Sequence, residues 1–82
     1  MRVIIPSGQH ATKRMVQRGV SAADIHHAVE NAVMTTDTRE GIMYVGPGIT
    51  RSALLKVWVL RHPRNPDAVT VKSVAWKDQD DD

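Results

Sequence analysis

The spacing of apolar residues changes once along this chain, near Val33, from a helical to a strand-like period. Before that point, a stripe at helical spacing follows Ser21 and consists of Ala22, Ile25, Ala28, Val29 and Ala32. After it, runs rich in β-branched residues alternate with turn residues as far as Trp76. Helices followed by consecutive strands favour an α+β domain, with an antiparallel sheet covered on one face by the helices.

Capping residues divide the helical part of the chain into two short helices. Ser7 can cap a helix from about Gly8 to Arg18, and Gly19 is well placed as its left-handed terminator. Ser21 and Asp24 form an acidic capping box at the start of a second helix. Because only two residues separate the helices, we expect a helical hairpin.

Four later segments are typical of strands, at residues 33–37, 42–46, 52–61 and 68–76. Turns rich in glycine and proline separate the last three of them. An earlier run, "RVII", is stopped by Pro6 and fits either an edge strand or a leading arm. We therefore expect the helical hairpin to pack on one face of an antiparallel sheet of about four strands.

Alternation within the two longest strands assigns a direction to their side chains. The face given to the helices is apolar and includes Leu55, Val57, Val59, Val69 and Val71. The opposite face then carries two lysines and two indoles, Lys56, Trp58, Lys72 and Trp76. This combination suits stacking on unpaired bases beside phosphate contacts. Alternatively, the two tryptophans close a second small core or an oligomer interface.

Acidic residues are unevenly distributed along the 82 residues. The tail "DQDDD" at residues 78–82 holds four of the nine acids, whereas residues 1–77 hold the other five and all eleven lysines and arginines. The net charge of residues 1–77 is therefore +6, which attracts polyanions. We expect one domain over residues 1–77 and a disordered acidic tail. The alternative is a tail that folds back over the basic surface.

Several classes of function are disfavoured by composition. The chain has no cysteine, which removes disulfides, thiol catalysis and cysteine-ligated zinc. It has no signal-peptide pattern and no apolar run near the roughly 18 residues of a membrane span. Neither an HExxH pattern nor a glycine-rich phosphate loop is present. We therefore expect a cytoplasmic protein with no membrane association, metal or cofactor.

One segment, "HATKRMVQRGVS", places His10, Arg14 and Arg18 along one face of the first helix. RNA cleavage without metal needs a base, a cation for the phosphorane charge and an acid for the leaving oxygen. The histidine and the arginines can supply the first two. The third would come from one of Tyr44, Lys56 or Lys72. The other interpretation is a network of contacts that fixes the helix in the fold.

That segment, together with "ADIHHAVENA" after it, resembles the small bacterial family called domain of unknown function 4258, over about residues 9–77. The positions that match the family pattern in order are His10, Ala11, Arg14, Met15, Arg18, Gly19, Val20 and Ser21. The family is similar to the barnase–EndoU–colicin–RelE group of small ribonucleases, which includes toxins of toxin–antitoxin pairs. The resemblance implies a RelE-like fold and makes RNA cleavage the leading functional hypothesis.

Under this hypothesis, the catalytic residues are His10, Arg14 and Arg18. The RNA-binding residues would be Lys13, Arg51, Lys56, Trp58, Lys72 and Trp76. The expected partners are RNA (a tRNA or a ribosome-bound mRNA), a cognate antitoxin and a second copy of the chain. One alternative is a noncatalytic module that binds nucleic acid or protein through the same basic face. Another is a phage or mobile-element accessory protein that dimerises through its tryptophans.

Overall fold

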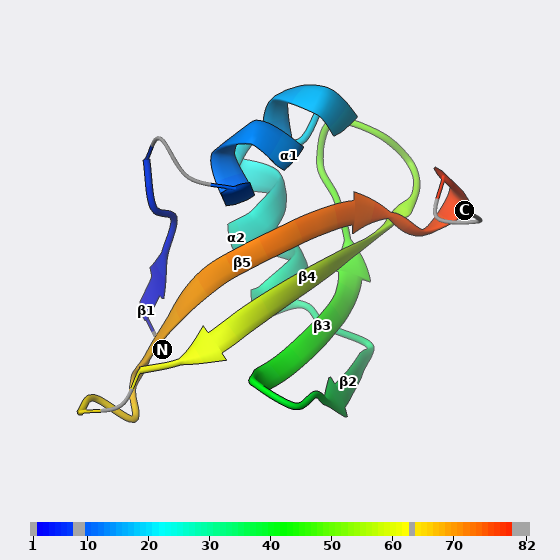
Figure 1. The fold of residues 1–82 in the computed structure, drawn as a ribbon. Helices are drawn as coiled ribbons and strands as arrows, with labels where there is room; N and C mark the ends of the chain where they lie inside the picture. Colours follow the sequence, from blue (N-terminus) through cyan, green and yellow to red (C-terminus); the bar gives the residue numbers. More distant parts are fainter. Residues whose placement is uncertain (1, 8–9, 63, 80–82) are drawn as a thin grey trace.

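The computed structural model describes residues 2–7, 10–62 and 64–79 (Figure 1). The elements, in chain order, are β1 (Arg2–Ile4), α1 (His10–Arg18), α2 (Ala22–Glu30), β2 (Met34–Asp37), β3 (Gly41–Pro47), β4 (Leu54–Arg61), β5 (Ala68–Trp76) and the 3-10 helix η1 (Lys77–Gln79). The expected helix start at Gly8 lies outside the described residues. Of the expected acidic tail, residues 80–82 lie outside them as well.

The described strands form one mixed sheet in the order β1-β5-β4-β3-β2. Antiparallel pairing joins β2 to β3, β3 to β4 and β4 to β5, whereas β1 runs parallel to β5. The α+β class is thus confirmed, and the four expected strands pair antiparallel, but a fifth strand at the edge makes the sheet mixed. The additional strand is "RVII", whose partner lies more than 60 residues away in the sequence. A pairing this distant leaves no local signal in the chain.

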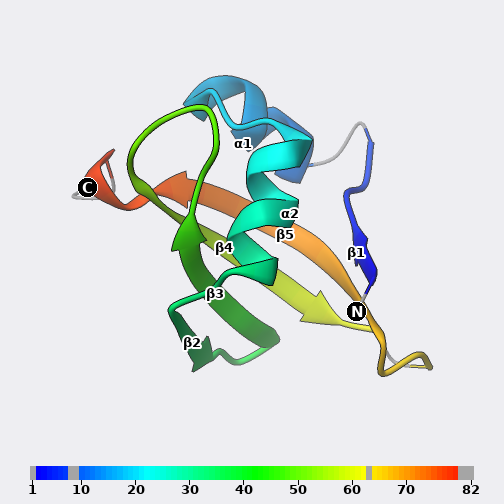
Figure 2. The same ribbon diagram turned by 180° about the vertical axis from the view of Figure 1, so that it is seen from behind.

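The two helices occupy different places on the sheet and do not form the expected hairpin packed on one face. α2 packs against β3 and β4, whereas α1 packs against β5 (Figures 1 and 2). β1 pairs only with Ala68–Thr70. Beyond them, the outer side of β5 pairs with no strand in the part of the chain that the structure describes. α1 lies beside this remainder of β5, because an unpaired strand edge needs cover.

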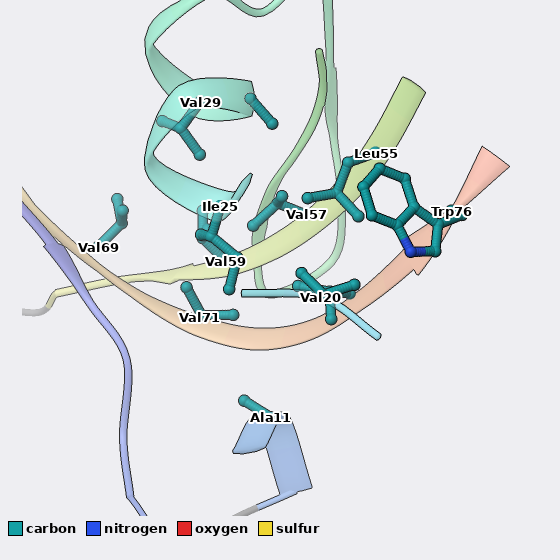
Figure 3. Packing of buried hydrophobic residues seen from close by; sticks show 12 residues of the cluster. Ala11, Val20, Ile25, Val29, Leu55, Val57, Val59, Val69, Val71 and Trp76 are labelled. Carbon is teal, nitrogen blue, oxygen red and sulfur yellow. The ribbon is translucent and has the colours of Figure 1, made fainter. Parts of the chain in front are cut away.

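The hydrophobic core lies between α2 and the central strands (Figure 3). Its buried side chains include Ile25, Ala28 and Val29 from α2, Leu55, Val57 and Val59 from β4, and Val69 and Val71 from β5. Each fully buried valine, leucine or isoleucine contributes about 1.5–3 kcal/mol relative to an exposed position. The helical stripe and the apolar strand face predicted from the sequence are therefore confirmed over these residues.

A β-bulge reverses the alternation in the second half of β5. Trp58 pairs with Ser73 and Val59 pairs with Val71, so Lys72 is an extra residue between the two pairs. After the bulge, Val74 and Trp76 point into the core, and Trp76 is fully buried. The expectation that Trp76 lies on the basic face is therefore wrong, and its ring is not exposed for stacking on a base. For the same reason, a dimer cannot form through a surface that contains both indoles.

Trp76 is enclosed by neighbours from two distant parts of the chain. Its indole Nε1 donates a hydrogen bond to the carbonyl of Arg18 at 2.8 Å. The loop after β3 covers the ring so closely that a Cβ at Gly48 would collide with it. The glycine is therefore required for this packing.

The different positions of the two tryptophans predict different stabilities for their alanine variants. Trp76→Ala should lower the free energy of unfolding by about 3–5 kcal/mol, because it leaves a large cavity in the core. Trp58→Ala, at a half-buried position on the other face, should cost less than half of that. Urea unfolding measures both. Equal losses would contradict the assignment of the two indoles to opposite faces.

Candidate nucleic-acid interface

The basic row of α1 lines an open hollow of about 310 Å³. The other walls of this hollow come from Trp58 on β4 and from Lys72 and Ser73 on β5. It lies where the outward face of α1 meets the sheet face opposite α2. The six lining residues are His10, Arg14, Arg18, Trp58, Lys72 and Ser73, and we call this the α1 hollow.

Within the α1 hollow, His10 and Arg14 are in contact with each other. Arg14 Nε donates to His10 Nε2 at 3.3 Å, and Arg14 Nη1 donates to Gln17 Oε1 at 2.9 Å. In this contact His10 Nε2 is the acceptor, so its lone pair points toward the guanidinium of Arg14. The nitrogen able to take up a proton thus faces the guanidinium that is best placed to hold an anion.

Arg18 has a structural role as well as a place in the α1 hollow. Its Nη1 donates to the carbonyl of Val74 at 2.7 Å, on the stretch of β5 that β1 does not reach. Its own carbonyl accepts the hydrogen bond from the indole of Trp76. These two bonds fix the end of α1 to β5. The alternative interpretation of the basic row was a network of contacts that fixes the helix in the fold. Arg18 makes such contacts.

Two of the predicted RNA-binding residues, Trp58 and Lys72, lie beside the predicted catalytic row. Lys72 lies on the face that alternation predicted and forms an ion pair with Glu40, and the β-bulge brings Ser73 onto the same face. The ammonium of Lys56 lies over the ring of Trp58, 5.9 Å from its centroid. Nothing in the sequence indicated that these strand residues lie beside α1, because this depends on how the helix packs against β5.

The other predicted residues lie elsewhere. Lys13 is exposed on α1 and does not line the hollow. Tyr44 lines a separate hollow that also includes Arg61. Of the three candidate acids for a leaving oxygen, which were Tyr44, Lys56 and Lys72, only Lys72 lines the α1 hollow.

Arg51 lies in the loop between β3 and β4, at the end of the sheet where η1 begins. Its guanidinium is 5.0 Å from the centroid of the Trp76 ring and forms an ion pair with Asp78 at 2.6 Å. The first acid of the predicted tail is therefore in contact with a predicted RNA-binding residue. Arg51 is not among the residues that line the α1 hollow.

The loop that carries Arg51 is held by the buried carboxylate of Asp24. This side chain accepts the capping hydrogen bond from the backbone N–H of Ser21 and another from the Ser21 hydroxyl, both at 2.9 Å. It also accepts from the backbone N–H groups of Ile49 and Thr50, at 2.7 and 2.8 Å, and from the Thr50 hydroxyl at 2.7 Å. The predicted capping box is confirmed, but the sequence did not reveal the contacts with the loop.

Two opposing effects determine the pKa of Asp24. Burial raises it, because desolvation disfavours the charged carboxylate. The hydrogen bonds from Ser21, Thr50 and Ile49 lower it, and they outweigh the effect of burial. The pKa of Asp24 is therefore held well below its usual range, and the side chain stays ionised inside the protein.

Two further properties concern the described residues as a whole. They contain no group of three or more histidine, cysteine, aspartate or glutamate side chains arranged to hold a metal ion. Among the helices that the structure describes, none is both long and apolar enough to cross a membrane.

Comparisons with protein-family models, curated proteins and solved structures found no match to this chain.

Because the pKa of Asp24 is lower in the folded than in the unfolded state, its stabilising effect depends on pH. The effect is fully present above the unfolded value of about 3.9 and is lost as the pH falls toward the folded value. At neutral pH, Asp24→Asn should lower the free energy of unfolding by about 2–4 kcal/mol, since it disrupts buried charge-assisted hydrogen bonds. The variant should also lose part of the acid dependence, as measured by urea unfolding at several pH values.

Asp37→Asn is the matched control, because Asp37 pairs with Arg61 on the surface and its side chain is 88% exposed. This variant should change stability by about 0–1 kcal/mol and keep the acid dependence of the parent. If both variants behaved alike, Asp24 would not have the role assigned to it.

Proposed function

We propose that this chain is a metal-independent ribonuclease of the RelE-like toxin class, with its active site in the α1 hollow. The observation that carries the proposal is the joining of His10 and Arg14 from α1 with Lys72 from β5 in one open hollow. A base, a cation and an acid, each needed for cleavage, thereby line the same space. The resemblance of residues 9–77 to domain of unknown function 4258 supports the same class.

In the proposed reaction, RNA binding displaces the hydrogen bond from Arg14 to His10 Nε2, and this nitrogen then takes the proton of the ribose 2′-hydroxyl. The 2′-oxygen then bonds to the adjacent phosphorus while the bond from phosphorus to the 5′-oxygen breaks. Lys72 gives a proton to that 5′-oxygen, so the products are a 2′,3′-cyclic phosphate and a 5′-hydroxyl. Exchange with water restores the proton of Lys72 and removes the one on His10.

The remaining charges of the hollow suit the transition state. Arg14 stabilises the negative charge that develops on the phosphorane oxygens, and its contact with His10 Nε2 places the cation beside the base. The part of Arg18 not bonded to Val74 adds positive charge at the wall of the hollow. The +6 charge of residues 1–77 attracts the RNA over a longer distance.

The proposed partners, an RNA substrate and an antitoxin, would both bind at the α1 hollow. The substrate would be a tRNA or a ribosome-bound mRNA in the cytoplasm. A cognate antitoxin would inhibit the protein by covering the α1 hollow with acidic side chains, which the excess of cations there would attract.

The proton-transfer role of His10 can be tested by RNA cleavage. Incubation of total RNA and purified tRNA with the wild-type protein, in the presence of a chelator, should give fragments ending in 2′,3′-cyclic phosphate. His10→Ala should reduce the rate by about 100-fold or more, because it removes the general base. His26→Ala is the matched control, since His26 is exposed on α2 and lies outside the hollow. Intact RNA with the wild-type protein would overturn the proposal.

A second function, binding of nucleic acid without cleavage, is favoured by the contacts that Arg18 and Lys72 already make within the protein. It predicts that His10→Ala leaves RNA affinity nearly unchanged, whereas Arg14→Ala weakens binding and lowers the salt dependence by about one counterion. Fluorescence anisotropy titrations at several salt concentrations measure both effects. An Arg14→Ala variant with unchanged affinity and salt dependence would show that the α1 hollow is not a phosphate site.

A further inference from the structure

A second hollow adjoins the α1 hollow on the same face of the sheet. It has a volume of about 220 Å³, and its far wall is the turn between β2 and β3, residues 38–40. Trp58 and Lys72 line both hollows, so these two side chains form the division between them. The two hollows lie in a row from α1 across β5 and β4 to the β2–β3 turn, and we call this row the path.

The division between the hollows has the chemistry of a nucleobase platform. Trp58 is half-buried on the strand, and Ser73 faces it across the pair of strands. The Lys56 ammonium over the indole adds positive charge beside the ring. An aromatic ring among cations is the arrangement that binds a base by stacking while its phosphates are held on either side.

The charges along this path favour a phosphate chain. Arg14, Arg18 and Lys72 line the first hollow, and Arg39 lines the second. Glu40 is the one acid among the residues that line the two hollows, and it is paired with Lys72. The pair carries no net charge, so the excess positive charge lies at the two ends of the path, on Arg14 and Arg18 in the first hollow and on Arg39 in the second.

We propose that Trp58 stacks on an unpaired nucleobase beside the scissile phosphate, and that Arg39 holds the neighbouring phosphate in the second hollow. The substrate is therefore single-stranded RNA, because the base faces of an A-form duplex are stacked on each other and cannot reach the indole. This inference rests on the proposed function for the identity of the scissile phosphate. It adds Arg39, which the sequence did not suggest, to the residues that contact RNA.

The test uses the full chain with His10→Ala, so that the RNA stays intact during binding. A short labelled RNA, single-stranded or annealed to its complement, is titrated and its anisotropy recorded. The single strand should bind more tightly than the duplex. Adding Trp58→Leu should weaken single-strand binding roughly 5- to 100-fold, since one base loses its stacking partner. Trp58→Phe, which keeps a ring, should recover most of the affinity.

Arg39 has a matched control in Arg64, an exposed arginine of the turn between β4 and β5 that lines neither hollow. Arg39→Ala should weaken single-strand binding and reduce its salt dependence by about one counterion, whereas Arg64→Ala should have little effect. An independent readout is tryptophan emission. Single-stranded RNA should quench it in the His10→Ala protein, and Trp58→Phe should abolish the quenching because Trp76 is buried.

The inference is overturned if the duplex binds as tightly as the single strand, or if the Trp58 and Arg39 variants bind RNA as the parent does. Its failure can be told apart from failure of the proposed function. Without cleavage by the wild-type protein, Trp58-dependent binding of single strands would leave the stacking site in place and remove the catalytic role of His10. If cleavage depended on His10 but not on Trp58 or Arg39, the catalytic role of His10 would stand and the stacking and phosphate sites would be removed.

Discussion

The buried carboxylate of Asp24 connects the parts of the structure that the candidate site requires. It caps α2 through Ser21 and, through Thr50, fixes the loop between β3 and β4. That loop covers Trp76, and the indole of Trp76 holds the carbonyl at the end of α1. A charge buried in this way is stable only with its donors in place, so loop, helix and indole must assume their positions together. The α1 hollow depends on this arrangement.

Local signals in the sequence were sufficient for the helices and for most of the strands. The capping box at Ser21 and the alternation through Val71 predicted elements that the structure confirms, because each depends on neighbours within a few residues. Three features were missed: the parallel pairing of β1, the bulge at Lys72 and the loop contacts of Asp24. Each depends on contacts between separate segments of the chain, which the pattern within one segment does not reveal.

The sequence predicted the residues that the helix contributes to the candidate site, but not how the strand residues meet them. The face shared by His10 and Arg14 follows from helical spacing, and they do contact each other. Which strand residues meet them depends on the packing of α1 against β5, and the bulge changes the direction of every side chain of β5 after Lys72. The same extra residue therefore moves Trp76 into the core and leaves Lys72 beside α1. A sequence interpretation with strict alternation placed both on one surface, and so described neither the core nor the hollow completely.

The charged side chains that line the α1 hollow differ in how strongly their contacts within the protein fix them. This difference determines which of them can move when an anion binds. Arg18 is fixed by a hydrogen bond to Val74, so it presents charge without reorganising. Lys72 is paired with Glu40 on the surface, where both side chains are about half exposed and such a pair is worth only about 0–1 kcal/mol. Exchanging the carboxylate of Glu40 for a phosphate thus costs little, whereas displacing Arg18 would uncover a backbone carbonyl of β5. Binding should therefore involve movement of Lys72 while α1 remains in place.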